Sequence, residues 1–313
     1  MTKVIYFAGG CFWGVEHFFK GVDGVREAVP GYANGRGTAP TYEQVYTDTT
    51  GFAETVRVSY IPERVSLQEL VKLFFAIIDP LSLNRQGHDE GTRYRTGIYY
   101  CEPSDLPVLE EAFRLETQLL GTSPVTELRP LESFFPAEDY HQDYLDKNPG
   151  GYCHLPLKAF RYLRLVQDLK YLLGDETDQI ARMSETAALI YERMHFFWVG
   201  FYRVCGDQLV LGPFQGPSAC LRIGYGKGVC GTAWQKKETV VVPDVEQFPG
   251  HIACSSESRS EIVVPLLCGG EVTAVLDIDS TDTGTFDSID AAFLGIIAEV
   301  LAPETITAPS EIK

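Results

Sequence analysis

Gly9-Gly10-Cys11-Phe12-Trp13-Gly14 places a cysteine between two short apolar runs. The run before it, Val4 to Phe7, is β-branched and aromatic and predicts a buried strand. The run after it, Val15 to Phe19, predicts the beginning of a helix. A thiol at a helix N-terminus faces unpaired backbone N–H groups and the positive end of the helix dipole. We therefore expect Cys11 to be a nucleophile whose thiol pKa lies below its ordinary value.

Length and composition indicate a globular protein with two cores. The chain has 313 residues, of which 45% are hydrophobic and 22% charged. Its formal net charge of -17 argues against nucleic acid and anionic membranes as partners. The sequence shows no long apolar span and no signal-peptide pattern, so we expect a cytoplasmic protein. Its eight cysteines are not spaced as a disulfide framework, which favours redox chemistry, catalysis or metal binding.

The first half of the chain alternates strands with amphipathic helices. Residues 54–60 and 97–100 have strand patterns, and residues 67–78 and 106–120 have helical patterns, the last ending at Gly121. The segments 31–41 and 84–95 are long and polar, and we expect them to be loops that carry function. We predict an α/β sandwich-like domain over residues 1–157.

The second half changes character after about residue 155. Two helices, a series of strands and a final helix predict an α+β domain over residues 158–303, with an antiparallel sheet flanked by helices. The expected helices are 163–173, 178–194 and 289–301, and the expected strands are 196–202, 208–211, 239–242, 261–266 and 272–278. Residues 304–313 are expected to form a flexible tail. The halves are unlike each other, which indicates a fusion of two domains.

Several motifs of the first half occur in the order found in one enzyme family. Besides Cys11, they contain the carboxylate Glu54, the phenols Tyr42 and Tyr94, and a second thiol, Cys153, after a glycine pair. Together they resemble the A-type peptide methionine sulfoxide reductases over residues 3–155. The motifs are Gly10-Cys11-Phe12-Trp13-Gly14, Gly31-Tyr32-Ala33-Asn34-Gly35, Pro40-Thr41-Tyr42, Gly51-Phe52-Ala53-Glu54, Gly87-His88-Asp89, Tyr94-Arg95, Ala137-Glu138-Asp139-Tyr140-His141-Gln142 and Gly151-Tyr152-Cys153.

The resemblance implies a role for each of these side chains. Cys11 would attack the sulfoxide sulfur and become a sulfenic acid, with Glu54 as the proton donor. Cys153 would then form a disulfide with Cys11, to be reduced by a thioredoxin-like dithiol. The family acts on the S epimer, in proteins and in the free amino acid. The remaining implied roles are the sulfoxide oxygen site for Tyr42 and Tyr94, the methyl site for Phe12 and Trp13, and orientation of the site for Asp89.

This sequence departs from the family pattern at two positions. Phe52 stands where a histidine is expected before Ala53-Glu54, and His88 stands where an asparagine is expected before Asp89. The first departure affects the surroundings of Glu54. Neither removes a residue to which the resemblance assigns a direct role.

A second group of cysteines lies in the C-terminal half. Cys220, Cys230 and Cys254 each occur in a glycine-bearing segment that we expect to be a loop. The acidic residues Glu261, Asp277 and Asp279 follow and predict a small acidic pocket suited to a ligand with an ammonium group. With His251, the three thiols also offer ligand types for zinc, but their spacing matches no compact zinc motif, and we predict neither a metal nor a cofactor. Cys101, Cys205 and Cys268 lie outside the motifs and are expected to be structural.

Residues 163–301 resemble the GAF-domain free methionine-R-sulfoxide reductases. The shared motifs include Trp198-Val199-Gly200-Phe201-Tyr202, Gly228-Val229-Cys230-Gly231, His251-Ile252-Ala253-Cys254, Ser260-Glu261-Ile262 and Asp277-Ile278-Asp279. The resemblance implies Cys254 as the nucleophile, Cys220 as the resolving thiol and Cys230 as a second candidate. It also implies that Trp198 and Tyr202 enclose the substrate and that Glu261, Asp277 and Asp279 bind its ammonium group or polarise the sulfoxide.

The C-terminal half also allows a function of another class. Ser255 stands where the family has an aspartate after the nucleophile, and a GAF fold alone implies no activity. A domain that senses oxidised methionine or thiol state, and regulates the first domain, is therefore the alternative hypothesis. A sensor of this kind requires no resolving cysteine, so the three cysteine positions favour catalysis.

Overall fold

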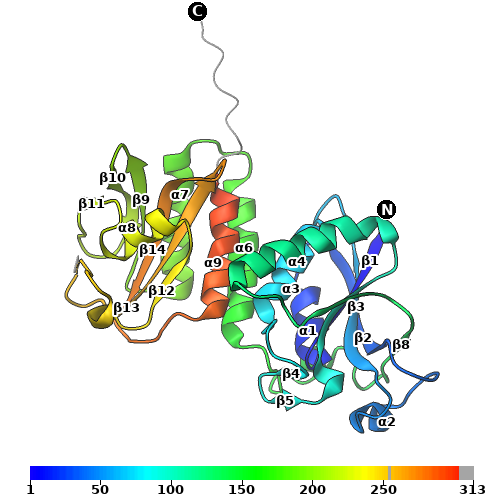
Figure 1. Ribbon diagram of the computed structural model, residues 1–313. Helices are drawn as coiled ribbons and strands as arrows, with labels where there is room; N and C mark the ends of the chain where they lie inside the picture. The colour runs from blue at the N-terminus through cyan, green and yellow to red at the C-terminus, as the bar shows by residue number, and fades with distance from the viewer. Residues whose placement is uncertain (253–254, 303–313) are drawn as a thin grey trace, which may run out of the picture. The chain divides into compact units, whose positions relative to one another are not determined.

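The computed structural model describes residues 1–252 and 255–302 (Figure 1). They form two compact units, one over Met1–Phe160 and one that begins at Arg161. Helix α6 (Leu157–Leu173) begins six residues before the helix expected at 163, so it is continuous through the domain boundary that we placed after residue 157. The prediction of two domains of mixed α and β structure is confirmed.

The first unit is built on a six-stranded sheet. Its order is β7-β6-β1-β3-β2-β8, in which β6 and β7 run parallel and the other neighbours antiparallel. The central strands β1 and β3 pair with Phe7 opposite Val56, and both runs are almost completely buried. The strands are β1 (Lys3–Gly9), β2 (Val25–Ala33), β3 (Ala53–Tyr60), β6 (Thr96–Tyr100), β7 (Glu127–Pro130) and β8 (Phe134–Pro136).

Helices α1 (Phe12–Lys20) and α3 (Leu67–Ile77) pack on one face of this sheet. The rings of Phe7, Phe19 and Phe74 form the contact, since Phe7 stacks on each of the other two at 4.7 Å. Helix α4 (Leu106–Leu120) packs on α3 and ends at Gly121 with φ +68°, as its sequence predicts. On the opposite face, Tyr6 packs edge-on against Phe134.

Two segments expected to be loops contain regular structure. Residues 31–33 complete β2, whose pattern is hidden because Pro30 and Gly31 interrupt it. Residues 84–95 form a small hairpin and a 3₁₀ turn, so their long polar run is shaped by local pairing. The short elements of this unit are α2 (Tyr42–Tyr46), β4 (Arg85–Gln86), β5 (Asp89–Glu90), η1 (Thr92–Tyr94), η2 (Pro103–Asp105) and α5 (Tyr144–Lys147).

The second unit has a six-stranded antiparallel sheet in the order β11-β10-β9-β14-β13-β12. Within it, Tyr162 of α6 stacks on Phe293 of α9 and donates a hydrogen bond to Asp290 at 2.8 Å. The remaining elements are α7 (Gln179–Met194), β9 (Trp198–Cys205), β10 (Gln208–Gln215), β11 (Arg222–Gly224), α8 (Gly228–Lys236), β12 (Val240–Val242), η3 (Val245–Gln247), β13 (Ser260–Cys268), β14 (Glu271–Ser280) and α9 (Ser288–Leu301).

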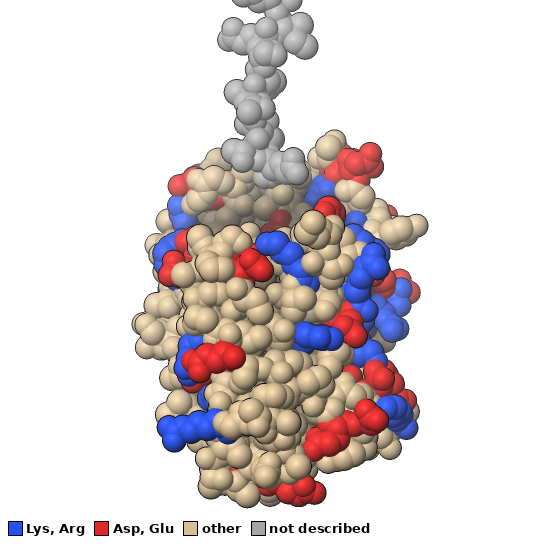
Figure 2. All heavy atoms as spheres, turned by 90° about the vertical axis from the view of Figure 1, so that its right-hand side faces the viewer, with Lys and Arg blue, Asp and Glu red and all other residues tan. Residues whose placement is uncertain are grey.

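Charged side chains of both signs occur on the face of the molecule shown in Figure 2. Acidic and basic side chains alternate over this face rather than gathering in one patch of a single sign (Figure 2). Within residues 1–252 and 255–302, none of the helices combines the length and apolar composition needed to cross a bilayer.

Candidate active sites

Cys11 lies at the junction of β1 and α1, where the chain leaves the middle of the sheet. Gly10 has φ +83°, a conformation that glycine adopts freely, and it turns the chain into the helix. The Cys11 side chain is 6% exposed. The next backbone N–H, that of Phe12, donates to Glu54 Oε2 at 3.1 Å. The first turn of α1 therefore holds a carboxyl group beside the thiol.

The expected lowering of the Cys11 pKa is wrong. Burial raises the pKa of this thiol well above its ordinary value, and the charge of Glu54 raises it further. The backbone N–H of Trp13 acts in the opposite direction, as the helix N-terminus should, but has the smaller effect. Cys11 is therefore a neutral thiol at pH 7 in the absence of substrate.

Glu54 is a buried carboxyl group on β3 with an exposed fraction of 2%. Burial raises its pKa to about 8, while the Phe12 N–H and the positive charge of Arg93 act to lower it. A carboxyl group with this pKa is mostly protonated at pH 7. It is therefore able to donate a proton within reach of Cys11.

Tyr42 and Tyr94 bring two phenols to the same place. Burial raises the pKa of Tyr42 to about 12 and also raises the pKa of Tyr94, and the charge of Glu54 acts on both. Both are thus neutral O–H donors at pH 7. The Tyr42 backbone N–H donates to Glu138 Oε1 at 2.8 Å, and Glu138 Oε2 accepts from Tyr32 at 2.8 Å. Glu138, which was not among the predicted site residues, fixes the position of Tyr42.

Arg93 holds Tyr94 in place and was not predicted. Its guanidinium carbon lies 4.3 Å from the Tyr46 ring centroid and 4.4 Å from that of Tyr94. Its Nη1 donates to Asp48 Oδ2 at 2.5 Å, and its backbone N–H donates to Asp48 Oδ1 at 3.0 Å. Arg93 is only 7% exposed, so its charge acts on Glu54 with little screening by solvent.

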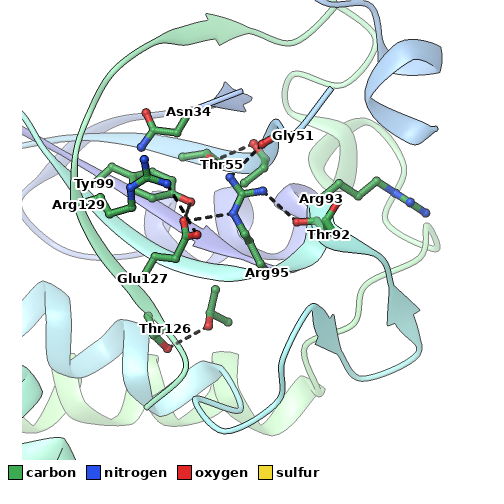
Figure 3. Close-up of polar contacts among 12 residues, drawn as sticks. Asn34, Gly51, Thr55, Thr92, Arg93, Arg95, Tyr99, Thr126, Glu127 and Arg129 are labelled. Carbon is green, nitrogen blue, oxygen red and sulfur yellow. Dashed lines mark hydrogen bonds and ion pairs between the residues drawn. The ribbon is translucent and has the colours of Figure 1, made fainter. Parts of the chain in front are cut away.

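Arg95 connects three segments of the first unit (Figure 3). It donates to the carbonyl of Thr92, to the carbonyl of Gly51 at 3.1 Å and to Glu127 Oε2 at 3.1 Å. Gly51 leads into the strand that carries Glu54, and Thr92 begins the turn that carries Tyr94. Arg95 therefore fixes the proton donor relative to one phenol. Its position directly after Tyr94 was the available signal in the sequence.

Aromatic rings enclose the space next to Cys11. Trp13 stacks on Tyr144 at 3.7 Å and donates from Nε1 to His141 Nδ1 at 3.1 Å. The His141 ring lies 5.1 Å from Phe12 and 4.7 Å from Tyr42. Burial lowers the pKa of His141, so this ring is neutral at pH 7. His141 therefore links both residues expected at the methyl site, Phe12 and Trp13, to Tyr42.

Cys153 packs against the first turn of α1. A Cβ placed on Gly14 would lie 3.1 Å from Cys153 Sγ, so the glycine leaves the space that this thiol fills. The charges of Cys153 and Asp89 both act on Cys11, and Tyr152 hydrogen-bonds Asp89. The structure therefore brings the two thiols and Asp89 into one cluster, with both Cys11 and Cys153 free.

The second unit contains a pocket over the inner strands of its sheet. The pocket is bordered by α8, by residues of β9, β11, β13 and β14, and by residues of two loops. The lining includes Trp198, Tyr202, Cys230, Glu261, Asp277 and Asp279, which are all of the C-terminal site residues predicted from the sequence except Cys220 and Cys254. Cys254 lies outside the described residues, and Cys220 is disulfide-bonded.

The acidic groups of this pocket are buried close together. Burial raises the pKa values of Glu261 and Asp277 well above the ordinary range, and the charge of Asp279 raises both further. Burial raises the pKa of Asp279 to about 6, against a hydrogen bond from Ser258. At pH 7 Asp279 is therefore charged while its two neighbours are mostly protonated.

We expected Cys230 to lie in a loop, but it lies on helix α8. The helix begins at Gly228 and buries Cys230 beside Glu261 and Asp277. Gly228 and Gly231 allow Ile252 and the Gly224 carbonyl to approach the helix closely. The thiol is free, and burial raises its pKa well above the ordinary value. Its sulfur and one oxygen of each of the two acids lie within 4.8 Å of one another. Of the zinc candidates that lie within residues 1–252 and 255–302, Cys230 is the one that belongs to this group.

Cys101, Cys205 and Cys268 were expected to be structural, but the exposure of two of them does not support that role. Cys101 and Cys205 are exposed, and Cys268 is half-buried. Cys101 and Cys205 stand at strand ends, where side chains leave the packed sheet.

Comparisons with known proteins match each half separately. The family described as peptide methionine sulfoxide reductase matches residues 3–169, and the GAF domain family matches residues 178–304. Peptide methionine sulfoxide reductase MsrA of Clostridium acetobutylicum is 52% identical over 159 residues, which cover 51% of this chain and 98% of that protein. MsrA of Clostridium perfringens strain SM101 is 52% identical over 155 residues, covering 50% of this chain and 99% of that protein.

Solved structures resemble the second half as well. Free methionine-R-sulfoxide reductase from Neisseria meningitidis, in complex with its substrate, is 52% identical and covers 45% of this chain and 86% of its own, with a TM-score of 0.45. The reduced form of the Staphylococcus aureus fRMsr is 44% identical and covers 45% and 92%, with a TM-score of 0.44. The family match over more than half of the residues shows that this chain belongs to the peptide methionine sulfoxide reductase family and carries a GAF domain in its C-terminal half.

Proposed function

We propose that the N-terminal unit of this methionine sulfoxide reductase reduces the S epimer of methionine sulfoxide, in peptides and as the free amino acid, through Cys11. The observation that carries this proposal is the protonated, buried Glu54 held at the Phe12 N–H beside the Cys11 thiol. Glu54 donates a proton to the sulfoxide oxygen as the Cys11 sulfur attacks, and it regains the thiol proton. Methionine leaves, and Cys11 carries the oxygen as a sulfenic acid.

The other groups of this site act on substrate position. The neutral hydroxyls of Tyr42 and Tyr94 donate to the sulfoxide oxygen, on which negative charge accumulates before protonation is complete. Phe12 and Trp13 contact the S-methyl group, and Asp89 orients the surrounding segment. Cys153 then forms a disulfide with Cys11, and a thioredoxin-like dithiol in the cytoplasm reduces it.

For the C-terminal unit we propose reduction of the R epimer of free methionine sulfoxide. The supporting observation is the buried pocket in which the charged Asp279 stands next to Glu261 and Asp277, since an ammonium group is the complementary ligand. Trp198 and Tyr202 border the same space and suit the side chain of the substrate. Cys254 is the proposed nucleophile and Cys220 its resolving thiol, with the free Cys230 as the second candidate.

The competing function for this unit is a sensor of oxidised methionine or thiol state that regulates the first unit. We take residues 1–157 and 158–303 as the limits of the two domains; the tail expected over residues 304–313 lies outside the described residues. The two functions differ in substrate turnover, which a sensor does not show. Reduction of purified free R-sulfoxide by the full chain with dithiothreitol, lost in the variant Cys254→Ser, would establish catalysis.

An acidic pocket that binds a free ammonium group should reject methionine within a peptide. We expect free R-sulfoxide to be reduced, while the N-acetylated R-sulfoxide and an R-sulfoxide inside a pentapeptide are reduced at least about 100-fold more slowly. S-sulfoxide in the same pentapeptide serves as the control, because the N-terminal unit should accept it. Comparable rates for free and peptide-bound R-sulfoxide would contradict the proposed specificity.

Replacement of Arg93 by Gln should move the pH profile of S-sulfoxide reduction. Arg93 lowers the pKa of Glu54, so removal of its charge allows that pKa to rise above about 8. Glu54 then stays protonated to higher pH. The fall of kcat/KM at alkaline pH should therefore shift to higher pH by roughly half a unit or more. Arg114→Gln, which removes an exposed arginine on α4, is the matched control. A limb that stays in place would show that Arg93 does not act on Glu54.

Replacement of Asp279 by Asn should weaken binding of free R-sulfoxide. Asp279 has a pKa of about 6 and is charged above that pH, so the wild-type KM should rise as the pH falls below 6. Loss of one charged contact predicts a KM about 10- to 100-fold higher at pH 7.5, with much less change in kcat. Glu271→Gln, at the exposed end of the same strand, is the control. A KM independent of pH between 7.5 and 5 would contradict this role.

A further inference from the structure

His154 follows the proposed resolving cysteine and has a fixed orientation. Its Nε2 lies 3.0 Å from the carbonyl oxygen of Gly9. A carbonyl oxygen only accepts hydrogen bonds, so Nε2 carries the hydrogen and Nδ1 bears a free lone pair in the neutral ring. Nδ1 is buried and has no hydrogen-bond partner among residues 1–252 and 255–302. A buried basic nitrogen without a partner is costly, which points to a role outside the resting state.

The free nitrogen of His154 and the Cys153 thiol both lie against Gly14 of α1. A Cβ placed on Gly14 would lie 3.1 Å from His154 Nδ1 and 3.1 Å from Cys153 Sγ. The two atoms therefore approach the same side of the first turn of α1, which directly follows Cys11. Gly10 adds to this, since a Cβ there would lie 3.2 Å from His154 Nε2. Two glycines of the Cys11 motif thus make room for this one imidazole ring.

The charges around these groups suit a proton transfer. Burial raises the pKa of the Cys153 thiol, and Asp89 raises it further, so a thiolate is scarce at pH 7. Burial lowers the pKa of His154, while Asp89 and the Gly9 carbonyl favour its protonated form. The neutral ring is therefore available as a base, and Asp89 stabilises the imidazolium that forms. Cys11, Tyr152 and Glu54 are the other titratable groups of this cluster.

We propose that His154 is the general base of the recycling step, which takes the proton of Cys153 as that thiol attacks the sulfenic acid of Cys11. The Cys153 sulfur forms a bond to the Cys11 sulfur, and the S–O bond of the sulfenic acid breaks. The imidazolium returns the proton to the leaving hydroxide, which becomes water. Cys153 is oxidised, the Cys11 sulfur is reduced, and no other reactant enters. This inference depends on the proposed function of the N-terminal unit.

The test separates the two chemical steps in the full chain. Reduced protein is mixed with methionine S-sulfoxide without a reductant and quenched, and methionine and the Cys11–Cys153 disulfide are measured over time. The variant His154→Gln keeps a donor for the Gly9 carbonyl but has no base at the position of Nδ1. Methionine should form at a rate within about twofold of wild type, while disulfide formation slows about 100-fold at pH 7. Dimedone should then trap the accumulated sulfenic acid on Cys11.

Two further observations exclude a purely structural role. Added imidazole should restore disulfide formation in His154→Gln and in His154→Ala, and raising the pH should restore it as hydroxide replaces the base. Disulfide formation at the wild-type rate in both variants would overturn the proposal, and so would slow formation that neither imidazole nor pH restores. Failure of the proposed function looks different, because wild-type protein would then form no methionine, or Cys153→Ser would still be recycled by thioredoxin.

Discussion

Replacement of Cys11 by Ser is expected to abolish reduction of S-sulfoxides and to leave reduction of free methionine R-sulfoxide at the wild-type rate. The serine hydroxyl is a poor nucleophile toward sulfur and cannot form the sulfenic acid or the later disulfide. Loss of the attacking group predicts a fall on the order of 10⁴-fold or more in kcat/KM for the S epimer. The measurement is turnover of each purified epimer with dithiothreitol.

The reciprocal variant completes this experiment. Cys254→Ser should remove R-sulfoxide reduction and spare the S epimer, because the proposed nucleophiles belong to different units. Cys101→Ser, which changes an exposed thiol of the first unit, should leave both activities unchanged. If Cys254→Ser retains both activities, the C-terminal domain is a sensor or a structural partner. If Cys11→Ser retains S-sulfoxide reduction, the role of Cys11 is wrong.

Replacement of Glu54 by Gln is the second change with a large expected effect. The amide oxygen of Gln can still accept the hydrogen bond from the Phe12 N–H, and its amino group can still donate to the sulfoxide oxygen. It cannot transfer a proton, so the rate of the first methionine formed should fall about 10²- to 10⁴-fold, with little change in KM. Single-turnover methionine formation measures this step without contribution from recycling.

The pH dependence gives an independent signature of Glu54. Because its pKa is raised to about 8, the acid is present below that pH and is lost as the pH rises through 8. The wild-type rate should fall above pH 8, and Glu54→Gln should show no such limb. Glu16→Gln is the matched control, since Glu16 is also buried, accepts a backbone N–H from Asp143 and has a pKa raised to about 7. If the rate of Glu54→Gln still falls near pH 8, a group other than Glu54 causes that fall.

The secondary structure of this chain is largely a local property. Helix α4 ends at Gly121 as its sequence predicts, and helix α3 begins at the capping box of Ser66 and Glu69. The strands β3, β9, β13 and β14 were predicted for the same reason, because their apolar pattern lies within each segment. Where the pattern was broken, as by Pro30 in β2, only pairing with the neighbouring strand revealed the element.

The chemical state of the site depended on contacts between distant segments. The sequence placed Cys11 at a helix N-terminus, which favours a thiolate, but burial dominates and keeps the thiol protonated. Glu54 is an acid at pH 7 because packing excludes water from it, and Arg93 acts on it from a turn nearly forty residues later.

By itself the sequence determined the family, the two domains of mixed structure and the order of the reactive residues, because these depend on residue identity and local periodicity. Only the tertiary structure decided which of those groups are charged, that Cys230 lies on a helix, and that His154 and Cys153 both lie against Gly14. The physical reason is that desolvation and electrostatic interactions depend on distance in space, and the folded chain brings together segments that are far apart in sequence.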